Sequence, residues 1–430
     1  METLLYHLKR LIPRSLFRFV QPPYHYLMSL LGAVVYQFPS KEITVIGVTG
    51  TKGKSSVVEI INAIFEADGK RTAVAGTIRF KIGEKSERNL YKMTMPGRFF
   101  TQRFLRDAVN AGCEVAIIEM TSEGVKQSRH RFIHLDALVF TNLSPEHIES
   151  HGSYEKYIAA KLELARSLER SQKRPRFMVA NKDDDHGHLF LEASVEHPLP
   201  YGLSDLELYN LNKDDISLVI EGSTLRVPLI GLFNVYNCLA GITTARAFGI
   251  PLRTIHTALA NLAPIKGRVE LFRSPKGASK KITVVVDYAH TPDSLEKLYT
   301  AFEKEKKIAV LGNTGGGRDK WKRPEMGRLA GEYCEKIILT NEDPYDEDPL
   351  AIVEDIARGV EDESKVRIIM DRRRAIRTAL EEAPQGSVIL ITGKGTDPYI
   401  MGPHNTKTPW SDAKVVQQEM ASLFGETNTP

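Results

Sequence analysis

The 430-residue chain has few cysteines, little net charge and no long hydrophobic run. Its three cysteines, Cys113, Cys238 and Cys334, are scattered and odd in number. This argues against a disulfide framework or a zinc site and indicates a reducing compartment. The net charge of +4 gives no reason to propose nucleic-acid binding. Internal repeats and long low-complexity tracts are also missing. We therefore expect a cytoplasmic globular protein, and the length suggests two or three domains.

The first 40 residues allow two interpretations. An apolar run from Tyr24 to Phe38 is preceded by four basic residues, Lys9, Arg10, Arg14 and Arg18. This order imitates a signal peptide, but no small-residue cleavage site follows it. The run is also too short and too polar for a transmembrane span. A helix docked on the next domain and an interfacial membrane helix both remain open, the latter giving peripheral membrane contact through residues 1–40.

Residues 43–64, ITVIGVTGTKGKSSVVEIINAI, have the pattern of a strand, a glycine loop and a helix. The run from Ile43 to Val48 is typical of a buried parallel strand, and apolar residues return at helical spacing after Ser56. In this context the loop indicates phosphate binding, because glycines let backbone N–H groups approach phosphate oxygens. Lys54 would supply a point charge for the β- and γ-phosphates, and a serine hydroxyl could bind Mg²⁺. Because Val48 stands where the common motif has glycine, the loop is a variant, and an ordinary glycine-rich turn is the alternative.

Strands and helices alternate from residue 41 onward. The apolar runs predict parallel strands at 72–75, 115–120, 137–141 and 177–180, with helices at 99–111 and 154–168. Short antiparallel strands are expected between 205 and 230, before helices at 234–247 and 252–262. The pattern resets near residues 264–268. We therefore expect an α/β protein made of a short N-terminal helical segment over 1–40, a central P-loop ATPase domain with a mostly parallel sheet over 41–265, and a C-terminal Rossmann-like α/β domain over 266–430.

Polar side chains follow several of these strands, where α/β sheets place their ligands. They are the loop at 49–56, the group from Glu119 to Glu123, the group from Asn142 to His147, and the group from Asp287 to His290. Glu119 and His147 could reach a cation held by a triphosphate, with Mg²⁺ or Mn²⁺ as candidates. A hydrogen-bonding loop histidine is the alternative for His147.

Three further features have both a functional and a structural interpretation. Lys161 lies on the helix at 154–168, where a solvated lysine is the simpler interpretation. The segment GGGRDKWKR suits anion capture, or is a basic surface loop. The segment TGKGTDPY follows a buried strand, and its Asp397 could hold the amino group of an incoming amino acid, or the segment is a simple turn.

These segments together resemble the Mur ligases, the ATP-dependent amino-acid-adding enzymes of peptidoglycan synthesis, and most of all their UDP-N-acetylmuramoyl-tripeptide synthetases. The matching strings are GVTGTKGKSS, EMTSEG, FTNLSPEHIESHGSYEKYIAAK, GLFNVYNCLAG, GRVE, VDYAHTPDSLE, GGGRDKWKRPEMG, TNEDPYDEDP and GKGTDPY. They occur in the family's order and cover roughly residues 43–412. The run VDYAHTPDSLE followed by GGGRDKWKR is nearly diagnostic by itself.

The resemblance implies a role for each matching residue. ATP phosphates would be bound by Gly50, Thr51, Lys52, Gly53, Lys54, Ser55 and Ser56. Mg²⁺ would be held by Ser55, Glu119, His147 and a carbamylated Lys161. The nucleotide would also lie by Asn234, Asn237, Arg268 and Asp287. Catalysis would depend on Lys54, Lys161, His147 and His290. The muramoyl-peptide substrate would contact Thr94, Met95, Pro96, Thr121 and Ser122, and the incoming amino acid Arg318, Asn341, Asp343, Tyr345, Gly393 and Asp397.

The resemblance also implies the reaction. The substrate carboxylate attacks the γ-phosphate of ATP to give an acyl phosphate and ADP, and the amine of the amino acid then displaces phosphate. The acyl phosphate must be shielded from water, so the second domain is expected to close over the first, with Pro264–Arg268 as the hinge. We expect a monomer that takes a muramoyl-peptide nucleotide and an amino acid as substrates.

The chain departs from the family's pattern in ways that bear on its substrates. Only about 40 residues precede the loop, where family members carry a domain that grips the uridine nucleotide. A member of the superfamily with a non-UDP acceptor, of folyl or poly-amino-acid type, is therefore the alternative. Tyr345 stands in EDPY where members that add diaminopimelate have the arginine of DNPR. A tyrosine cannot clasp a distal carboxylate bidentately, so lysine or another amino acid is at least as well supported. Glu123 stands where a histidine is common, and Lys52 replaces the usual asparagine.

Overall fold

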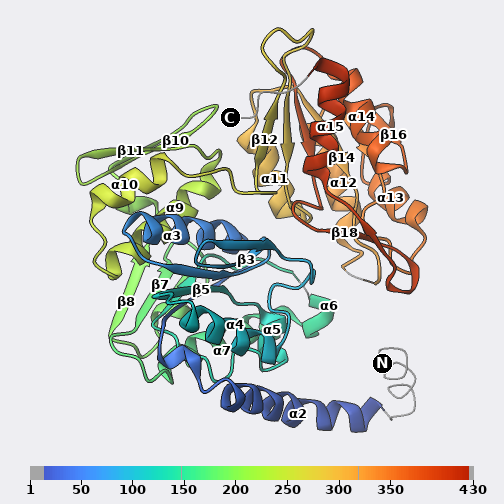
Figure 1. Ribbon diagram of the computed structural model, residues 1–430. Helices are drawn as coiled ribbons and strands as arrows, with labels where there is room; N and C mark the ends of the chain where they lie inside the picture. The colour runs from blue at the N-terminus through green and yellow to red at the C-terminus, as the bar shows by residue number, and fades with distance from the viewer. Residues whose placement is uncertain (1–13, 147, 318, 426–430) are drawn as a thin grey trace.

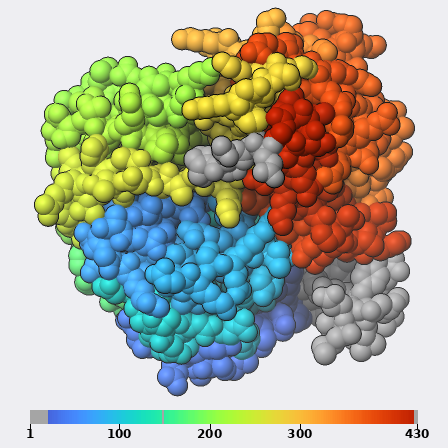
Figure 2. Space-filling model, turned by 45° about the horizontal axis from the view of Figure 1, so that its top comes forward, coloured from blue at the N-terminus to red at the C-terminus, as the bar shows by residue number. Residues whose placement is uncertain are grey.

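A computed structural model describes residues 14–146, 148–317 and 319–425. Figure 1 shows two α/β units in chain order, the first coloured from blue to yellow-green and the second from yellow to red. The N-terminal helix α2 (Arg14–Val35) lies along the edge of the first unit that faces away from the second. Figure 2 shows the same two units meeting along one side. The α/β fold class predicted from the sequence is confirmed.

The first unit is built on an eight-stranded sheet in the order β4-β3-β2-β5-β1-β6-β7-β8. The six strands from β2 to β8 in this order are parallel, while β3 and β4 form an antiparallel hairpin at one edge. The strands are β1 (Thr44–Thr49), β2 (Thr72–Ala75), β3 (Arg79–Ile82), β4 (Lys85–Arg88), β5 (Val115–Glu119), β6 (Ala137–Phe140), β7 (Phe177–Asn181) and β8 (His197–Tyr201). Because β1 lies between β5 and β6, the polar groups after these three strands meet at one sheet edge.

Helices cover both faces of this sheet (Figure 1). One apolar core joins β1 to α3 and α9 through Val57, Ile61, Val235 and Leu239, and the other joins the opposite face to α4 and α7 through Leu105 and Leu164. The helices are α3 (Lys54–Ala67), α4 (Arg98–Asn110), α5 (Ser122–Lys126), α6 (Ile148–His151), α7 (Tyr154–Glu169), α8 (Gly187–Leu191), α9 (Leu232–Ala247) and α10 (Leu252–Ala260). A three-stranded antiparallel sheet of β9 (Leu208–Leu211), β10 (Ile216–Ile220) and β11 (Ser223–Val227) packs beside α10.

The second unit has a six-stranded sheet in the order β12-β13-β17-β14-β15-β16, parallel except for β12. Its strands are β12 (Glu270–Arg273), β13 (Thr283–Val286), β14 (Lys307–Leu311), β15 (Lys336–Leu339), β16 (Val366–Ile368) and β17 (Val388–Ile391), with the hairpin β18 (Tyr399–Met401) and β19 (Lys407–Pro409) beside them. Its helices are α11 (Pro292–Ala301), α12 (Lys322–Tyr333), α13 (Pro349–Ala357), α14 (Arg372–Glu382) and α15 (Asp412–Phe424). The short 3-10 helices are η1 (Pro39–Lys41), η2 (Leu203–Asp205), η3 (Glu363–Lys365) and η4 (Pro403–Asn405).

Helix α2 docks on the first unit against α4. The Ser29 hydroxyl donates to the Ser128 carbonyl at 2.7 Å, and the Tyr26 ring meets the Phe132 ring edge-on at 5.3 Å. The described part of this segment is therefore a helix that docks on the first unit with one face. Over the part of the chain that the structure describes, no helix combines the length and the apolar character needed to cross a bilayer.

Candidate active site

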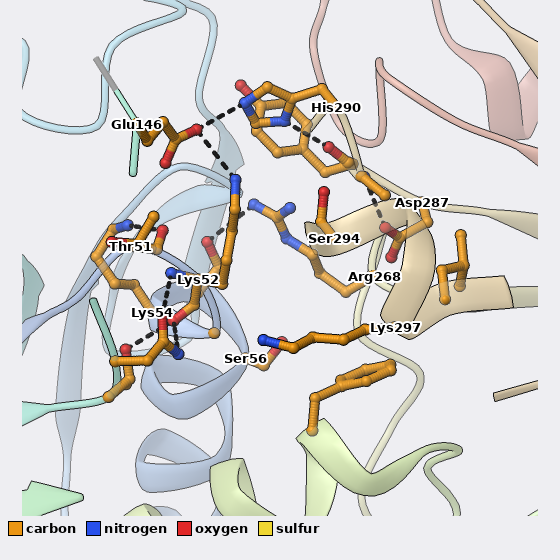
Figure 3. A pocket seen from close by; sticks show the side chains of 18 of the residues that line it. Thr51, Lys52, Lys54, Ser56, Glu146, Arg268, Asp287, His290, Ser294 and Lys297 are labelled. Atoms are coloured by element: carbon orange, nitrogen blue, oxygen red, sulfur yellow. Dashed lines mark hydrogen bonds and ion pairs between the residues drawn. The ribbon is translucent and has the colours of Figure 1, made fainter. Parts of the chain in front are cut away.

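A cavity of about 830 Å³ lies where the carboxyl ends of the first sheet face the second unit. Its lining includes the loop at 51–56, Glu119, Asn142 and Glu146 from the first unit. The second unit contributes Arg268, Asp287, His290, Asp343, Gly393 and Asp397. Figure 3 shows side chains from the two units pointing toward one another across this space. The strand ends that the sequence singled out in both halves of the chain therefore share one cavity.

The loop between β1 and α3 has the backbone of an anion cradle. Gly50 has φ +146° and Gly53 has φ +82°, conformations that favour glycine. A Cβ at Gly53 would lie 2.5 Å from Asn237 Oδ1, so glycine is also needed for close packing against α9. Lys54 Nζ donates to the carbonyls of Gly50 and Thr51, each at 2.9 Å. These bonds hold the ammonium group over the loop, at the N-terminus of α3, where an anion is favoured.

Lys161 lies on the buried face of α7 and is 2 % exposed. The buried residues of this helix recur at helical spacing, namely Tyr157, Lys161, Leu164, Ala165 and Leu168. Lys161 Nζ donates to the Gly50 carbonyl at 2.6 Å and lies 4.9 Å from the centre of the Tyr157 ring. Burial, followed by the charge of Lys54, lowers the pKa of Lys161 well below its ordinary value. The interpretation of Lys161 as a solvated surface lysine is therefore wrong.

Glu119 ends β5 inside the cavity and is buried. Its two oxygens accept from the Thr77 amide at 2.8 Å and the Thr77 hydroxyl at 2.9 Å. No cluster of three or more His, Cys, Asp or Glu side chains that could hold a metal occurs among the described residues, which leave out His147. Mg²⁺ takes one or two carboxylates together with substrate phosphates and waters, so a lone carboxylate beside a phosphate loop fits this ion. The Ser55 hydroxyl lies in the same cavity.

Glu146 connects the two units; it belongs to the group from Asn142 to His147 noted in the sequence, but no role was predicted for it. Its Oε1 accepts from Lys52 Nζ at 3.0 Å and lies 3.0 Å from His290 Nε2 (Figure 3). His290 Nδ1 lies 2.8 Å from the Tyr288 carbonyl, so both ring nitrogens face oxygen acceptors. Burial and then Lys52 lower the pKa of His290 to about 4, with Glu146 acting in the opposite direction. The ring is therefore neutral at neutral pH, and one of its two nitrogens donates.

Arg268 and Asp287 bring the start of the second unit to the phosphate loop. Arg268 Nη2 lies 3.2 Å from Ser55 Oγ, and its guanidinium carbon lies 4.4 Å from the centre of the Tyr288 ring. The Asp287 carboxylate accepts from the amides of Val269 and Ala289 at 2.8 and 2.7 Å, which fixes the chain around Arg268. Burial raises the pKa of Asp287 above its ordinary value, and the charge of Arg268 offsets only part of this rise.

The two asparagines expected beside the nucleotide lie on the first two turns of α9 and line the cavity. The Asn234 amide donates to the Ile230 carbonyl at 2.9 Å, and the Asn237 amide donates to Asn234 Oδ1 at 2.8 Å. Their side chains are therefore fixed in the wall of the cavity.

The residues expected to contact the other substrates divide into two groups. Thr94, Thr121, Asp343, Tyr345, Gly393 and Asp397 line the cavity. Met95, Pro96, Ser122 and Asn341 do not belong to its lining. The Met95 carbonyl accepts from Arg129, and the Ser122 hydroxyl lies 3.1 Å from His151 Nε2. His147 and Arg318 lie outside the described residues.

Two regions of the chain match domains of a known family. Residues 48–245 match the Mur ligase middle domain, and residues 267–395 match the glutamate ligase domain of Mur ligases. A UDP-N-acetylmuramyl-tripeptide synthetase of Roseiflexus sp. (strain RS-1) is 35% identical over 421 residues, which cover 91% of this chain and 81% of that protein. A UDP-N-acetylmuramoyl-L-alanyl-D-glutamate--2,6-diaminopimelate ligase of Aquifex aeolicus (strain VF5) is 36% identical over 408 residues, covering 90% and 80%.

Solved structures with similar folds agree with these matches. A UDP-N-acetylmuramoyl-L-alanyl-D-glutamate--2,6-diaminopimelate ligase is 28% identical, with a TM-score of 0.58 over 88% of this chain and 78% of that one. Mycobacterium tuberculosis folylpolyglutamate synthase complexed with ADP has a TM-score of 0.68 over 86% and 92%, but is 17% identical. The second likeness therefore concerns the fold alone.

Proposed function

The chain belongs to the Mur ligase family, and we propose that it uses the cavity between its two units to join the carboxylate of a muramoyl peptide to the amino group of an amino acid. The chain is an ATP-dependent ligase of peptidoglycan synthesis that forms an amide bond. The observation that carries the proposal is the shared cavity, because it places the phosphate loop opposite the acidic residues of the second unit. A reaction that uses first a phosphate donor and then an amine requires both the phosphate loop and the acidic residues opposite it.

The proposed mechanism has two steps. A carboxylate oxygen of the acceptor attacks the γ-phosphorus of ATP, and the bond between this phosphorus and the β,γ-bridging oxygen breaks. The products of this step are ADP and an acyl phosphate. The Lys54 ammonium and the loop amides would stabilise the developing negative charge. The neutral amine of the amino acid then attacks the acyl carbon, the bond between this carbon and the phosphate oxygen breaks, and the departing phosphate takes the proton that the amine loses. The contact between Arg268 and Ser55 and the link through Glu146 would keep the units closed and exclude water from the acyl phosphate.

We propose Mg²⁺ and a carbamate on Lys161 as parts of this site. Glu119 and Ser55 from the described residues, with His147, would hold the ion, which would neutralise phosphate charge when bound. Only a neutral amine reacts with carbon dioxide, giving a carbamate and a proton. The lowered pKa of Lys161 supports this reaction because it raises the fraction of neutral amine at a given pH.

The muramoyl-peptide acceptor is proposed over the folyl or poly-amino-acid alternative, which the comparisons do not favour. Proteins named for muramoyl-peptide substrates are 34–36% identical to this chain over most of its length, whereas the folylpolyglutamate synthase shares the fold at 17% identity. We propose an acceptor like a UDP-N-acetylmuramoyl dipeptide. The amino acid stays open, because Tyr345, which lines the cavity, replaces the arginine of members that add diaminopimelate and cannot clasp a distal carboxylate bidentately.

The proposed organisation keeps the boundaries expected from the sequence, with divisions at residues 40 and 265. Two observations support the second boundary: β11 and α10 belong to the first unit, and β12, which begins at Glu270, belongs to the second sheet. A monomer in a reducing, cytoplasmic compartment remains the expectation.

We also propose that α2 lies on an anionic bilayer surface. Six of its exposed apolar residues recur at helical spacing and are Val20, Tyr24, Leu27, Leu31, Val34 and Val35, whereas Tyr26, also exposed, lies on the docked side against Phe132. At 100° per residue they fill an arc of about 100° on the side opposite the docked residues His25, Ser29 and Ala33. Four basic residues, Lys9, Arg10, Arg14 and Arg18, precede this face in the sequence and complement acidic lipid head groups.

Charged substitutions on this face are expected to reduce vesicle binding about tenfold. The full chain would be sedimented with phosphatidylglycerol-containing vesicles, comparing wild type with a Leu27→Glu, Leu31→Glu variant. A Leu208→Glu, Leu350→Glu variant is the matched control, because Leu27 and Leu208 are 57% and 55% exposed on different surfaces. Equal vesicle binding by both variants would contradict the proposal, and so would binding of the wild type to neutral vesicles only. A stable complex with a protein, in place of vesicle binding, would assign this face of α2 to that protein.

The ligase activity itself is tested by phosphate release from ATP over a panel of acceptors and amino acids. We expect release only when a UDP-N-acetylmuramoyl-L-alanyl-D-glutamate acceptor, ATP and a suitable amino acid are all present. Lysine and diaminopimelate should be compared first, followed by neutral and acidic amino acids, with a pteroyl-glutamate acceptor as the competing substrate. No release above background with any muramoyl peptide would overturn the proposed function.

A further inference from the structure

The described cations of the segment GGGRDKWKR have different surroundings. Lys320 and Arg323 both contact Glu347, each at 2.8 Å, and Arg323 also contacts Asp355 at 2.9 Å. Arg323 is fully buried, so these carboxylates compensate its charge inside the second unit. Lys322 instead lines the reaction cavity. Of these cations, Lys322 is therefore the one placed to receive an anion from the cavity.

Lys322 is the first residue of α12 and is 5% exposed. Its ammonium group has no hydrogen-bond or ion-pair partner among the residues that the structure describes. A buried ammonium group without a partner is unfavourable, because burial removes its hydration and nothing replaces it. Burial accordingly lowers the pKa of Lys322 below its ordinary value. An anion in the cavity would compensate this group.

The charges that act on Lys322 show which parts of the cavity it faces. Besides burial, its pKa responds to four charged side chains, which are Glu146, Glu342, Lys52 and Asp319 in decreasing order of effect. Lys52 belongs to the phosphate loop and bonds to Glu146, whereas Glu342 follows β15. Lys322 also lowers the pKa of His290, which contacts Glu146. Its ammonium group therefore lies between the phosphate loop and the end of β15.

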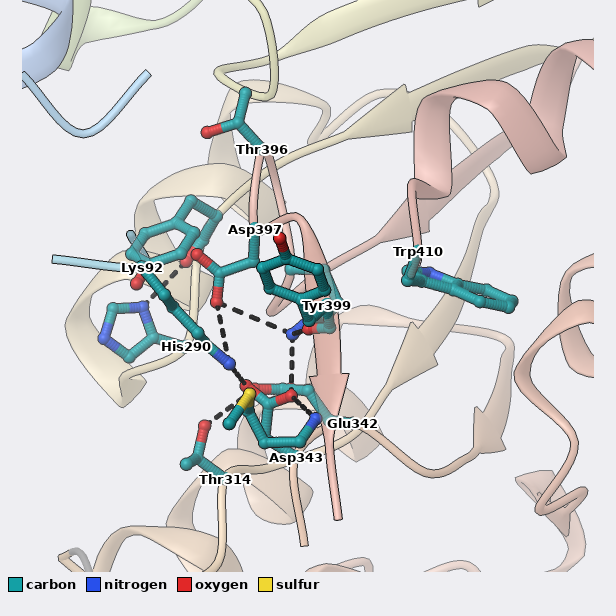
Figure 4. Close-up of polar contacts among 12 residues, drawn as sticks. Lys92, His290, Thr314, Glu342, Asp343, Thr396, Asp397, Tyr399 and Trp410 are labelled. Atoms are coloured by element: carbon teal, nitrogen blue, oxygen red, sulfur yellow. Dashed lines mark hydrogen bonds and ion pairs between the residues drawn. The ribbon is translucent and has the colours of Figure 1, made fainter. Parts of the chain in front are cut away.

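The two acids with the largest effects have other partners. Glu146 Oε1 accepts from Lys52 Nζ at 3.0 Å. Glu342 Oε1 accepts from the Thr314 hydroxyl, also at 3.0 Å (Figure 4). Glu342 Oε2 is buried with no hydrogen-bond partner among the described residues, and it makes no ion pair with Lys322. The cations that lower the pKa of Glu342 are Arg372 and Lys394. Lys322 is therefore a direct partner of neither acid.

We propose that Lys322 binds the phosphoryl group that leaves ATP, first within the acyl phosphate and then as free phosphate. The Lys54 ammonium group approaches this group from the first unit, and the Lys322 ammonium group approaches it from the second. Lys322 donates hydrogen bonds to phosphoryl oxygens and transfers no proton in either step. Its charge stabilises the negative charge that first the acyl phosphate and then the departing phosphate carries.

The phosphoryl group is favoured over the carboxylate of the amino acid by the charges around Lys322. Glu146 has the largest effect on its pKa, and Glu146 is bonded to Lys52 of the phosphate loop. The name of the anion rests on the proposed function. The site itself is tested by binding, without turnover.

The test is calorimetric binding of inorganic phosphate to the full chain in the presence of ADP and Mg²⁺. Lys322→Met is expected to raise the Kd for phosphate about 10- to 100-fold, because a charge-assisted hydrogen bond in a buried site is lost. Its Kd for ADP should stay close to the wild-type value. Lys322→Arg keeps a cation and should restore most of the phosphate binding. Lys320→Met is the matched control, because Lys320 lies in the same segment but is 57% exposed and pairs with Glu347.

Thermal unfolding separates this role from a structural one. Removal of a buried charge without a partner should leave the Tm unchanged or raise it. A lower Tm in Lys322→Met would assign Lys322 to the buried acids and overturn the proposal. Unchanged phosphate binding in this variant, an equal loss in Lys320→Met, or no phosphate binding by the wild type would also overturn it.

Two further results distinguish the anion and the function. Weaker binding of L-lysine to Lys322→Met with unchanged phosphate binding would assign Lys322 to the carboxylate of the amino acid, against the proposal. Phosphate binding beside ADP requires neither acceptor nor amino acid. A failed ligase assay together with the expected loss of phosphate binding in Lys322→Met would therefore refute the proposed function and leave the anion site standing.

Discussion

Replacing Lys161 with methionine is expected to reduce kcat/KM by about 10²- to 10³-fold and to raise the free energy of unfolding. The loss of activity follows from the proposed carbamate, since methionine offers no amine to react with carbon dioxide. Bicarbonate should therefore not rescue the variant. The gain in stability follows from the position of the side chain, which lies on the apolar face of α7 and keeps its amine away from water.

The stability difference should depend on pH in one direction. The pKa of Lys161 is well below its ordinary value of 10.5 in the folded chain. Between the folded and unfolded pKa values the unfolded state binds more protons, so the free energy of unfolding of the wild type rises with pH across this window. The advantage of Lys161→Met is therefore largest below the window and shrinks toward pH 10.5. The comparison requires buffers free of carbon dioxide, because a carbamate would remove the titrating amine.

Three measurements test the predicted stability gain, the loss of activity and the carbamate. They are, in that order, denaturant titrations, phosphate release, and ¹³C spectra of enzyme equilibrated with labelled bicarbonate. A labelled carbamate signal should be present in the wild type and absent in Lys161→Met. Lys156→Met is the matched control, because Lys156 lies on the same helix with its side chain exposed, and it should change none of the three. Retained ligase activity in Lys161→Met, or a variant that loses stability together with activity, would contradict the assignment.

The parallel strands were predictable because each is a short apolar run buried on both faces, as at Val115–Glu119. Strands at the edges of the sheets were missed. The residues of β4 are all exposed and polar, and β8 contains two prolines, which an edge strand tolerates because one side of its backbone makes no ladder bonds. The buried orientation of Lys161 was in principle readable, since Tyr157, Leu164 and Leu168 define the same helical face.

Other parts of the site depend on contacts that no local pattern encodes. Glu146 is linked to Lys52 and His290, which lie 94 and 144 residues away. Lys92 meets Asp343 across 251 residues. The sequence pattern identified one side of some contacts, such as the phosphate loop and Asp397 after β17, because polar residues after buried strands indicate a ligand edge. Asp343 after β15 was implied only by the family resemblance. The packing of the two units decides which side chains of the first unit complete the site. A single sequence contains no tertiary contacts and therefore cannot supply this information.

Replacing Lys54 with methionine is expected to lower kcat/KM by about 10³-fold, the largest effect within the phosphate loop. Two carbonyl bonds hold its ammonium group over the loop. Burial lowers the pKa of Lys54 below its ordinary value, and the charges of Glu119 and Glu146 offset part of this decrease. Methionine has a similar shape and no charge, so the loop should keep its backbone while losing the group that neutralises the transferring phosphoryl oxygens.

Lys52→Met gives the comparison that separates this role from a general loss of positive charge. Lys52 has the same charge in the same loop, but its Nζ donates to Glu146 and so links the loop to His290 of the second unit. Its removal should weaken closure and cost about tenfold, because a contact that orients the units is made with or without the transition state. Phosphate release and calorimetric ADP binding would be measured for both variants. A Lys54→Met enzyme within about tenfold of wild type, or a Lys52→Met enzyme as inactive as Lys54→Met, would show that the phosphoryl group is neutralised elsewhere in the cavity.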